Sequence, residues 1–159
     1  MYLHSFRFIA PKKVSEAQKF TLIFTDADKI ETVADKLRYY RYKKGMYQLD
    51  VADYLGIDKG TYIDYENPDR DYYSAEIMEK LAELFEVDVH SLLDEYNKFL
   101  YDGQGRNIKE LRKHLKITQE DLAREMNVSL LKVKRWEQNK VRMFKFTWGR
   151  LTALVNLTE

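Results

Sequence analysis

The chain has 159 residues, of which 45% are hydrophobic, a size that allows one ordinary core or two small ones. It has no apolar run of the roughly 18 residues that a transmembrane helix needs, no cysteine for a disulfide framework, and no apolar N-terminal segment typical of a secretory signal. The composition therefore favours a soluble, cytoplasmic protein.

Charge is distributed unevenly along the chain, although the formal net charge is only +1. Residues 1–31 hold 5 Lys+Arg and 4 Asp+Glu, residues 32–100 hold 9 and 15, and residues 101–159 hold 13 and 7. The three balances are therefore +1, −6 and +6. A polyanion is expected to prefer the C-terminal third of the molecule.

Residues 1–31 are predicted to form a short pair of β-strands. The segment LHSFRFI (residues 3–9) alternates polar and apolar residues, KFTLIFT (residues 19–25) is rich in β-branched and aromatic residues, and Pro11 lies between them. Because two strands alone are marginally stable, this extension is expected to pack on the rest of the chain or to pair with a second copy. The second possibility predicts a homodimer through the N-terminal extension.

Residues 32–100 are predicted to begin with three short helices. Apolar residues at helical spacing indicate a first helix over residues 33–44, and a second helix is expected from about residue 48 to 55. Gly56 then supplies a left-handed turn residue, and Asp58 is a suitable N-cap for the third helix. The pattern is that of a helix-turn-helix.

The same pattern recurs 71 residues later in the chain. In the second copy Asn127 and Ser129 take the places of Gly56 and Asp58, and both are suitable for a left-handed turn and a cap. Within residues 33–66 five residues are identical to those at this offset: Arg41/Arg112, Gln48/Gln119, Asp50/Asp121, Ala52/Ala123 and Glu66/Glu137. The repeat therefore predicts two helix-turn-helix units in tandem.

The segments YQLDVADYLGID…YIDYE (residues 47–66) and TQEDLAREMNVS…VKRWE (residues 118–137) resemble the Cro/C1-type, phage-repressor-like helix-turn-helix family. IMEKLAELFEVDVHSLL (residues 77–93) is similar to that family's fourth and fifth helices, whereas Pro68 departs from the glycine that the family has after its third helix. The resemblance implies a mainly α fold with a first unit at residues 32–100 and a second at 101–159. The second unit ends too early for a fifth helix, and its core is expected to be covered by a segment from elsewhere in the chain.

In this family the third helix of a unit lies in the DNA major groove and the second helix is anchored on the phosphate backbone. The resemblance therefore implies a sequence-specific transcription regulator, a repressor of phage, plasmid or bacterial origin that occupies an operator on double-stranded DNA. It also implies that Arg41–Glu66 and Arg112–Glu137 bridge the first and third helices. Gln48 and Gln119 match the family's phosphate-contacting glutamine, although a residue at a helix start can equally be a capping partner.

The second unit is the favoured DNA reader. If Val133 and Trp136 face the core, the basic side chains of the third helix are exposed, where an arginine can pair with guanine and a leucine can meet a thymine methyl group. The candidate DNA contacts are Gln119, Ser129, Leu130, Leu131, Lys132, Lys134 and Arg135, with Lys140, Arg142 and Lys145 on phosphates in the loop that follows.

The first unit is less suited to DNA, because Asp64, Asp69 and Asp71 would repel phosphates. Its candidate contacts are Gln48, Lys59 and Thr61. Whether both units engage DNA together stays open, and helix-turn-helix geometry can also be a packing unit only. The acidic and aromatic first unit supports an alternative function, a protein-interaction module or antitoxin-type partner.

No pattern indicates catalysis or metal binding. No nucleophile stands with a matching base, and His4, His90 and His114 have no paired spacing for a metal. The segment GQGRN (residues 103–107) is too weak for a phosphate loop and is interpreted as the linker between the units. The chain is expected not to be an enzyme and to need no cofactor.

Overall fold

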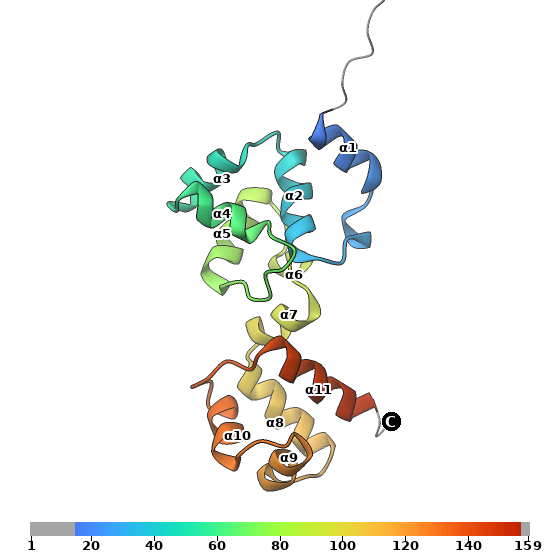
Figure 1. Cartoon of the computed structure of the whole chain (residues 1–159), viewed down its shortest axis with the longest axis vertical. Helices are drawn as coiled ribbons and strands as arrows, with labels where there is room; N and C mark the ends of the chain where they lie inside the picture. The colour runs from blue at the N-terminus through green and yellow to red at the C-terminus, as the bar shows by residue number, and fades with distance from the viewer. Residues whose placement is uncertain (1–14, 157–159) are drawn as a thin grey trace, which may run out of the picture.

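The computed structural model describes residues 15–156, which form two helical units in tandem with a short helix between them (Figure 1). Every regular element in this range is helical, as the repeat predicts. None of the described helices is long and apolar enough to cross a membrane.

The first unit packs five helices around one core. The helices are α2 (Val33–Lys43), α3 (Gln48–Leu55), α4 (Lys59–Tyr65), α5 (Ala75–Phe85) and α6 (Val89–Leu92). Leu37, Val51, Tyr62, Leu81 and Leu92 are completely buried where these helices meet. Each of the five helices therefore contributes a fully buried apolar side chain to the core.

The second unit repeats this arrangement and has a core of its own. Its helices are α8 (Gln104–His114), α9 (Gln119–Glu125), α10 (Leu130–Glu137) and α11 (Lys145–Asn156). The first residues of α8, α9 and α10 each lie 71 positions after those of α2, α3 and α4. Ile108, Leu122, Val133 and Trp136 are buried between them. The predicted tandem repeat is confirmed, and Val133 and Trp136 face the core as expected.

The turn between the second and third helices has the same geometry in both units. Gly56 has φ 69° and Asn127 has φ 48°, so both adopt the left-handed conformation. The Asp58 carboxylate accepts a hydrogen bond from the Thr61 N–H at 2.9 Å, and the Ser129 hydroxyl accepts one from the Lys132 N–H at 3.3 Å. These contacts confirm the predicted turns and caps.

Helix α7 (Glu95–Tyr101) joins the units and supplies the second one with aromatic side chains. The ring centroids of Tyr96 and Phe99 lie 5.8 and 6.4 Å from that of Trp148 on α11. The Tyr96 hydroxyl also donates a hydrogen bond to the Met143 carbonyl at 2.6 Å. Helix α7 is therefore the segment from outside the second unit that covers its core.

The predicted N-terminal strand pair is wrong. Most of the second expected strand lies in helix α1 (Glu16–Ile23), which is followed by a 3₁₀ turn, η1 (Ala27–Lys29), and no strand occurs in residues 15–156. The first expected strand, residues 3–9, lies outside the described residues.

A capping box explains why this segment is helical. The Ser15 hydroxyl accepts from the Gln18 N–H at 3.2 Å, and the Gln18 side chain accepts from the Ser15 N–H at 3.0 Å. This reciprocal pair satisfies two donors that a helix start otherwise leaves free. Helix formation also places the Phe20 ring 5.5 Å from the Tyr42 ring on α2. Together the cap and this packing outweigh the β propensity of the aromatic and β-branched residues.

Candidate nucleic-acid interface

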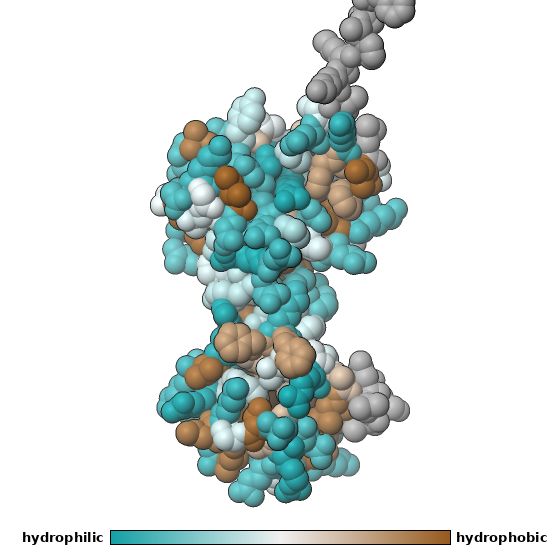
Figure 2. Space-filling model, viewed as in Figure 1, coloured by the Kyte–Doolittle hydropathy of each residue, from teal (hydrophilic) through white to brown (hydrophobic). Residues whose placement is uncertain are grey.

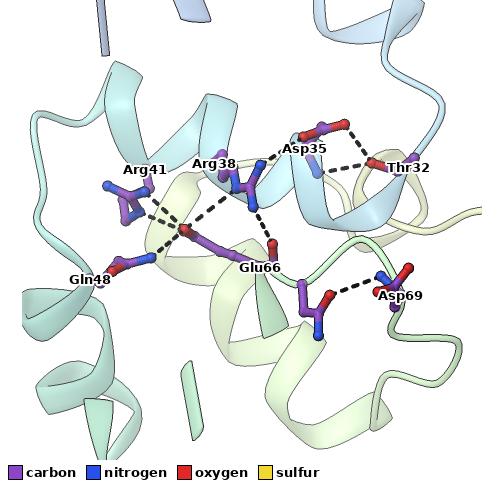
Figure 3. Close-up of polar contacts among 8 residues, drawn as sticks. Thr32, Asp35, Arg38, Arg41, Gln48, Glu66 and Asp69 are labelled. Atoms are coloured by element: carbon purple, nitrogen blue, oxygen red, sulfur yellow. Dashed lines mark hydrogen bonds and ion pairs between the residues drawn. The ribbon is translucent and has the colours of Figure 1, made fainter. Parts of the chain in front are cut away.

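A buried ion pair fixes the three helices of the first helix-turn-helix (Figure 3). Arg41 Nε and Nη2 on α2 lie 2.5 and 2.9 Å from the two carboxylate oxygens of Glu66, and the Gln48 amide on α3 donates to the same carboxylate at 2.9 Å. Burial disfavours the charged guanidinium, but the bonds and charge of Glu66 outweigh this and raise the pKa of Arg41. The first and second helices are thereby tied to the C-terminal end of α4.

The second unit contains the same network at the same spacing. Arg112 Nε lies 2.9 Å from Glu137 Oε1, and the Gln119 amide donates to Glu137 Oε2 at 2.7 Å. The predicted bridging pairs, Arg41–Glu66 and Arg112–Glu137, are both confirmed. Sequence reasoning did not predict that each glutamine joins its pair.

The network determines what the two glutamines can offer to a ligand. A carboxamide nitrogen carries two N–H donors. One N–H of Gln119 is bound to Glu137, which orients the amide and leaves a second donor. The half-buried Gln119 and Gln48 are therefore suited to donate to a phosphate oxygen while still holding α9 or α3 in place.

Helix α10 presents a row of basic side chains to solvent. Lys132, Lys134 and Arg135 are all exposed. Lys134 and Arg135 form no ion pair with any residue in the described range, and Lys132 Nζ lies 5.6 Å from the ring centroid of Trp136. The charges of this helix are thus not neutralised by neighbouring residues.

The two leucines of α10 differ in their surroundings. Leu131 is 56% exposed, whereas Leu130 is half-buried and packs against the core of the second unit. Ser129 is exposed but its hydroxyl caps the helix. Of these three candidate contacts, Leu131 is the one with a large free apolar surface for a thymine methyl group.

A hollow of about 730 Å³ lies beside α10, where α8 turns into α9. Arg112, Lys116, Gln119 and Lys134 contribute to its lining, with Glu120 as the acidic member. The concentration of N–H donors and positive charge at one concave surface is suited to an anionic backbone.

The loop after α10 is held by a buried amide. Gln104, on the first turn of α8, donates to the Val141 carbonyl at 2.7 Å and accepts from the Met143 N–H at 2.7 Å. Lys140, just before the first anchor, and Arg142, between the two anchors, are exposed. Residues 103–107 are therefore not a simple linker, because they begin α8 and fix the loop that carries two of the predicted phosphate contacts.

The last two basic candidates face the junction between the units. Arg142 Cζ lies 3.8 Å from the ring centroid of Tyr72, and Lys145 Nζ lies 3.0 Å from Asp94 and 3.7 Å from Asp71. These contacts occupy Lys145 with two carboxylates. Lys145 thus acts as a bridge between the units, while exposed Lys140 remains the freer cation of the loop.

The corresponding surface of the first unit has a different chemistry. Lys59 and Thr61 are exposed, and the positions that match Lys134 and Arg135 are occupied by Ile63 and Asp64. Asp64 forms an ion pair with Arg70. The matching hollow, about 500 Å³, is lined in part by the acidic Glu16 of α1. The first unit has the fold of the second without its positive surface.

Family comparisons agree with this geometry. A family model described as "Helix-turn-helix domain" matches residues 34–98, and one described as "Helix-turn-helix" matches residues 108–143. The chain is a protein with two helix-turn-helix domains in tandem.

Two curated proteins are similar to this tandem helix-turn-helix protein. The HTH-type transcriptional regulator SinR of Bacillus subtilis (strain 168) is 31% identical over 72 residues, and SinR of Bacillus licheniformis is 29% identical over the same length. Each alignment covers 45% of the chain and 65% of the relative, so the chain spans less than two thirds of the curated relatives it matches. No solved structure matches the chain significantly.

Proposed function

We propose that the tandem helix-turn-helix protein is a transcription regulator that binds double-stranded DNA by sequence and represses by occupying an operator. Its second unit is the main reader and it needs no cofactor. The SinR proteins, which are named as transcriptional regulators, support this proposal by similarity. A protein that acts on DNA in a bacterium or its phages and plasmids works in the cytoplasm, and we propose that location.

The observation that carries the proposal is the exposed basic surface of α10 within a helix-turn-helix. Lys132, Lys134 and Arg135 project from a helix whose opposite side is fixed by buried Val133 and Trp136. In the docking geometry of such motifs, this helix enters the major groove. Arg135 is then placed to pair with guanine, and Leu131 to contact thymine.

The remaining candidates are proposed to position the protein on the backbone. Gln119 offers its second N–H at the start of α9, and Lys140 and Arg142 follow α10 on the loop that Gln104 anchors. Phosphate contacts set register and orientation, whereas base contacts carry the sequence preference. The rigid network around Glu137 keeps both sets in one fixed arrangement.

A second candidate function is a protein-interaction module, of the antitoxin type, formed by the first unit. Four large apolar side chains that are 44–78% exposed on and beside α3 and α4 favour it. The two functions differ in their ligand, so pull-down assays with DNA and with protein as the ligand distinguish them. They are compatible if each unit has its own partner.

Homodimerisation through the N-terminal extension also remains a prediction. Its expected strands are replaced by α1 in the described part of that extension, so a dimer there would use the outer side of α1, where Ile23 is 72% exposed. Sedimentation of the full chain against a variant with Ile23→Lys tests this. A change in mass is expected, and equal masses would remove α1 from the interface.

Selection of bound duplexes from a random DNA pool tests the main proposal. The full chain is expected to enrich one short motif, and the isolated motif should bind more tightly than shuffled duplexes of equal length. The specific and non-specific affinities of a regulator typically differ by about 10³–10⁷. Recovery of no motif, with equal binding to all duplexes, would contradict sequence-specific recognition.

A further inference from the structure

The helix-turn-helix surface of the first unit carries apolar side chains that its fold does not require. Tyr47 is 78% exposed, Leu49 50%, Tyr54 47% and Ile63 44%. At the four matching positions the second unit has Thr118, Glu120, Glu125 and Lys134. Because the same backbone is formed with polar residues there, the apolar ones need another explanation.

Charge is inverted on the same surface. Asp53 on α3 matches Arg124 on α9, and Asp64 on α4 matches Arg135 on α10. All four side chains are exposed. Two surfaces of equal backbone geometry therefore carry opposite charges within one chain.

The residues of the first unit form one connected surface. Tyr47 and Leu49 line the 500 Å³ hollow together with Lys59, and Ile63 lies one helical turn after Lys59 on α4. Leu49 is in turn one helical turn before Asp53 on α3. Figure 2 shows brown side chains at the surface in the region of α3 and α4. The acidic–apolar surface comprises Tyr47, Leu49, Asp53, Tyr54, Ile63 and Asp64, and the exposed cation Lys59 lies among them.

We propose that the acidic–apolar surface binds the second unit of another copy of the chain, on the surface formed by Arg124, Leu131, Lys134 and Arg135. This second-unit surface is complementary to the acidic–apolar surface, since it combines three cations with Leu131, which is 56% exposed. The regional balances of −6 and +6 act in the same direction.

The contact must join two molecules. Figure 1 places α3 and α4 in one unit and α9 and α10 in the other, on opposite sides of α7, so a chain does not reach its own second surface. Asp64 and Arg124 are exposed, and each already has a half-buried ion-pair partner: Asp64 pairs with Arg70, and Arg124 with Asp121 at 3.3 Å. Ion pairs at the protein surface contribute little free energy and can be exchanged. The resulting association is head-to-tail.

Such association covers the surface that the proposed function gives to DNA. Only this consequence rests on the proposed function: DNA should compete with the second copy for Lys134 and Arg135. The association itself is measured without DNA, so its failure and the failure of DNA binding are separate results.

Reciprocal substitutions test the contact with the full chain. One variant carries Asp53→Arg and Ile63→Lys, and the other carries Arg124→Asp and Lys134→Ile. Each substitution installs the residue that the other unit has at the same position, so each is compatible with the backbone. Thermal melts check that both variants fold. Masses are measured by sedimentation at low salt, on the order of 0.01–0.05 M, where screening is weak.

The wild type is expected to gain mass with concentration and to lose this gain on the order of 0.5 M salt, where charges are screened. Neither variant alone should gain mass with concentration, because each retains only one of the two surfaces that the contact needs. An equimolar mixture should form a species larger than either variant alone, since it reunites one intact surface of each kind. A wild type of constant mass at low salt, or a mixture no larger than its components, would overturn the proposal.

Discussion

Gln104 and Gly105 begin α8, yet they determine how α10 and the loop after it are held. Gln104 is 95% buried and bonds to the loop through both ends of its amide. Gly105 lies so close to α10 that a Cβ atom there would meet the Glu137 carbonyl oxygen at 2.5 Å. Neither residue is among the proposed DNA contacts, but both position groups that are.

Gly105→Ala is expected to lower the free energy of unfolding by about 1–3 kcal/mol, because the added methyl group forces backbone apart in a packed site. Denaturant unfolding followed by tryptophan fluorescence measures this, since Trp136 and Trp148 both belong to the second unit. Gly149→Ala is the matched control, because that helical glycine has nothing within 4 Å of its Cβ position. The control should be stabilised by roughly 0.4–1 kcal/mol. Equal effects of the two changes would show that α8 and α10 are not closely packed.

The two helix-turn-helix units share one architecture because a few local signals are repeated. Gly56 and Asn127 adopt left-handed turns, buried Ala52 and Ala123 allow two helices to pack closely, and each unit closes an Arg–Glu–Gln network. Such signals depend on neighbours within about 25 residues, which a sequence pattern displays directly. This explains why helix order and turn positions were predicted from sequence.

Other features depend on contacts that a sequence pattern does not display. Lys145 was predicted to contact phosphate, but it lies between Asp71 and Asp94, more than 50 residues away. Residues 19–25 were predicted as a strand from composition, whereas the Ser15–Gln18 capping box starts a helix. That capping signal was present in the sequence and could have been recognised.

Acid should weaken the start of α9. The Thr118 hydroxyl bonds to Asp121 and lowers the pKa of that carboxyl below its ordinary value of 3.8. A carboxyl with a lower pKa in the folded state stabilises the fold fully above its unfolded pKa, and this contribution is lost as pH falls through the folded value. The free energy of unfolding should therefore decline below about pH 4.

Asp121→Asn removes this titration, so its stability should fall less steeply between about pH 4 and pH 2. Unfolding curves at successive pH values provide the measurement. Asp102→Asn is a comparison on a carboxylate outside the helix-turn-helix core. A wild type and an Asp121→Asn variant with parallel pH profiles would mean that the cap does not titrate as described.

The loop after α10 should set the salt dependence of DNA binding through Lys140. Each phosphate contact releases counterions, so Lys140→Ala should weaken binding to all duplexes and reduce the slope of log affinity against log salt by about one. Lys109→Ala is the control, because this exposed lysine lies on α8 outside the proposed surface. An unchanged slope for Lys140→Ala would remove the loop from the interface.

Considered as a whole, the molecule duplicates one fold and gives its copies opposite surfaces. The first unit has a charge of −6 in residues 32–100, and the second has +6 in residues 101–159. The two units share the buried Arg–Glu–Gln network, while each exposed position of α4 carries a different residue from the matching position of α10. This division is consistent with one unit for DNA and another for protein.

Arg135 and Asp64 occupy the same position in the two units, so their substitution compares the units directly. Duplex titrations of Arg135→Ala and Asp64→Ala, on a selected motif and at several salt concentrations, decide which unit reads DNA. Arg135→Ala is predicted to cost about 1–3 kcal/mol on the preferred sequence and to reduce discrimination. Asp64→Ala is predicted to leave affinity unchanged or to raise it, because it removes a negative charge. Undiminished specific binding by Arg135→Ala, together with its loss in Lys59→Ala, would assign the reading role to the first unit instead.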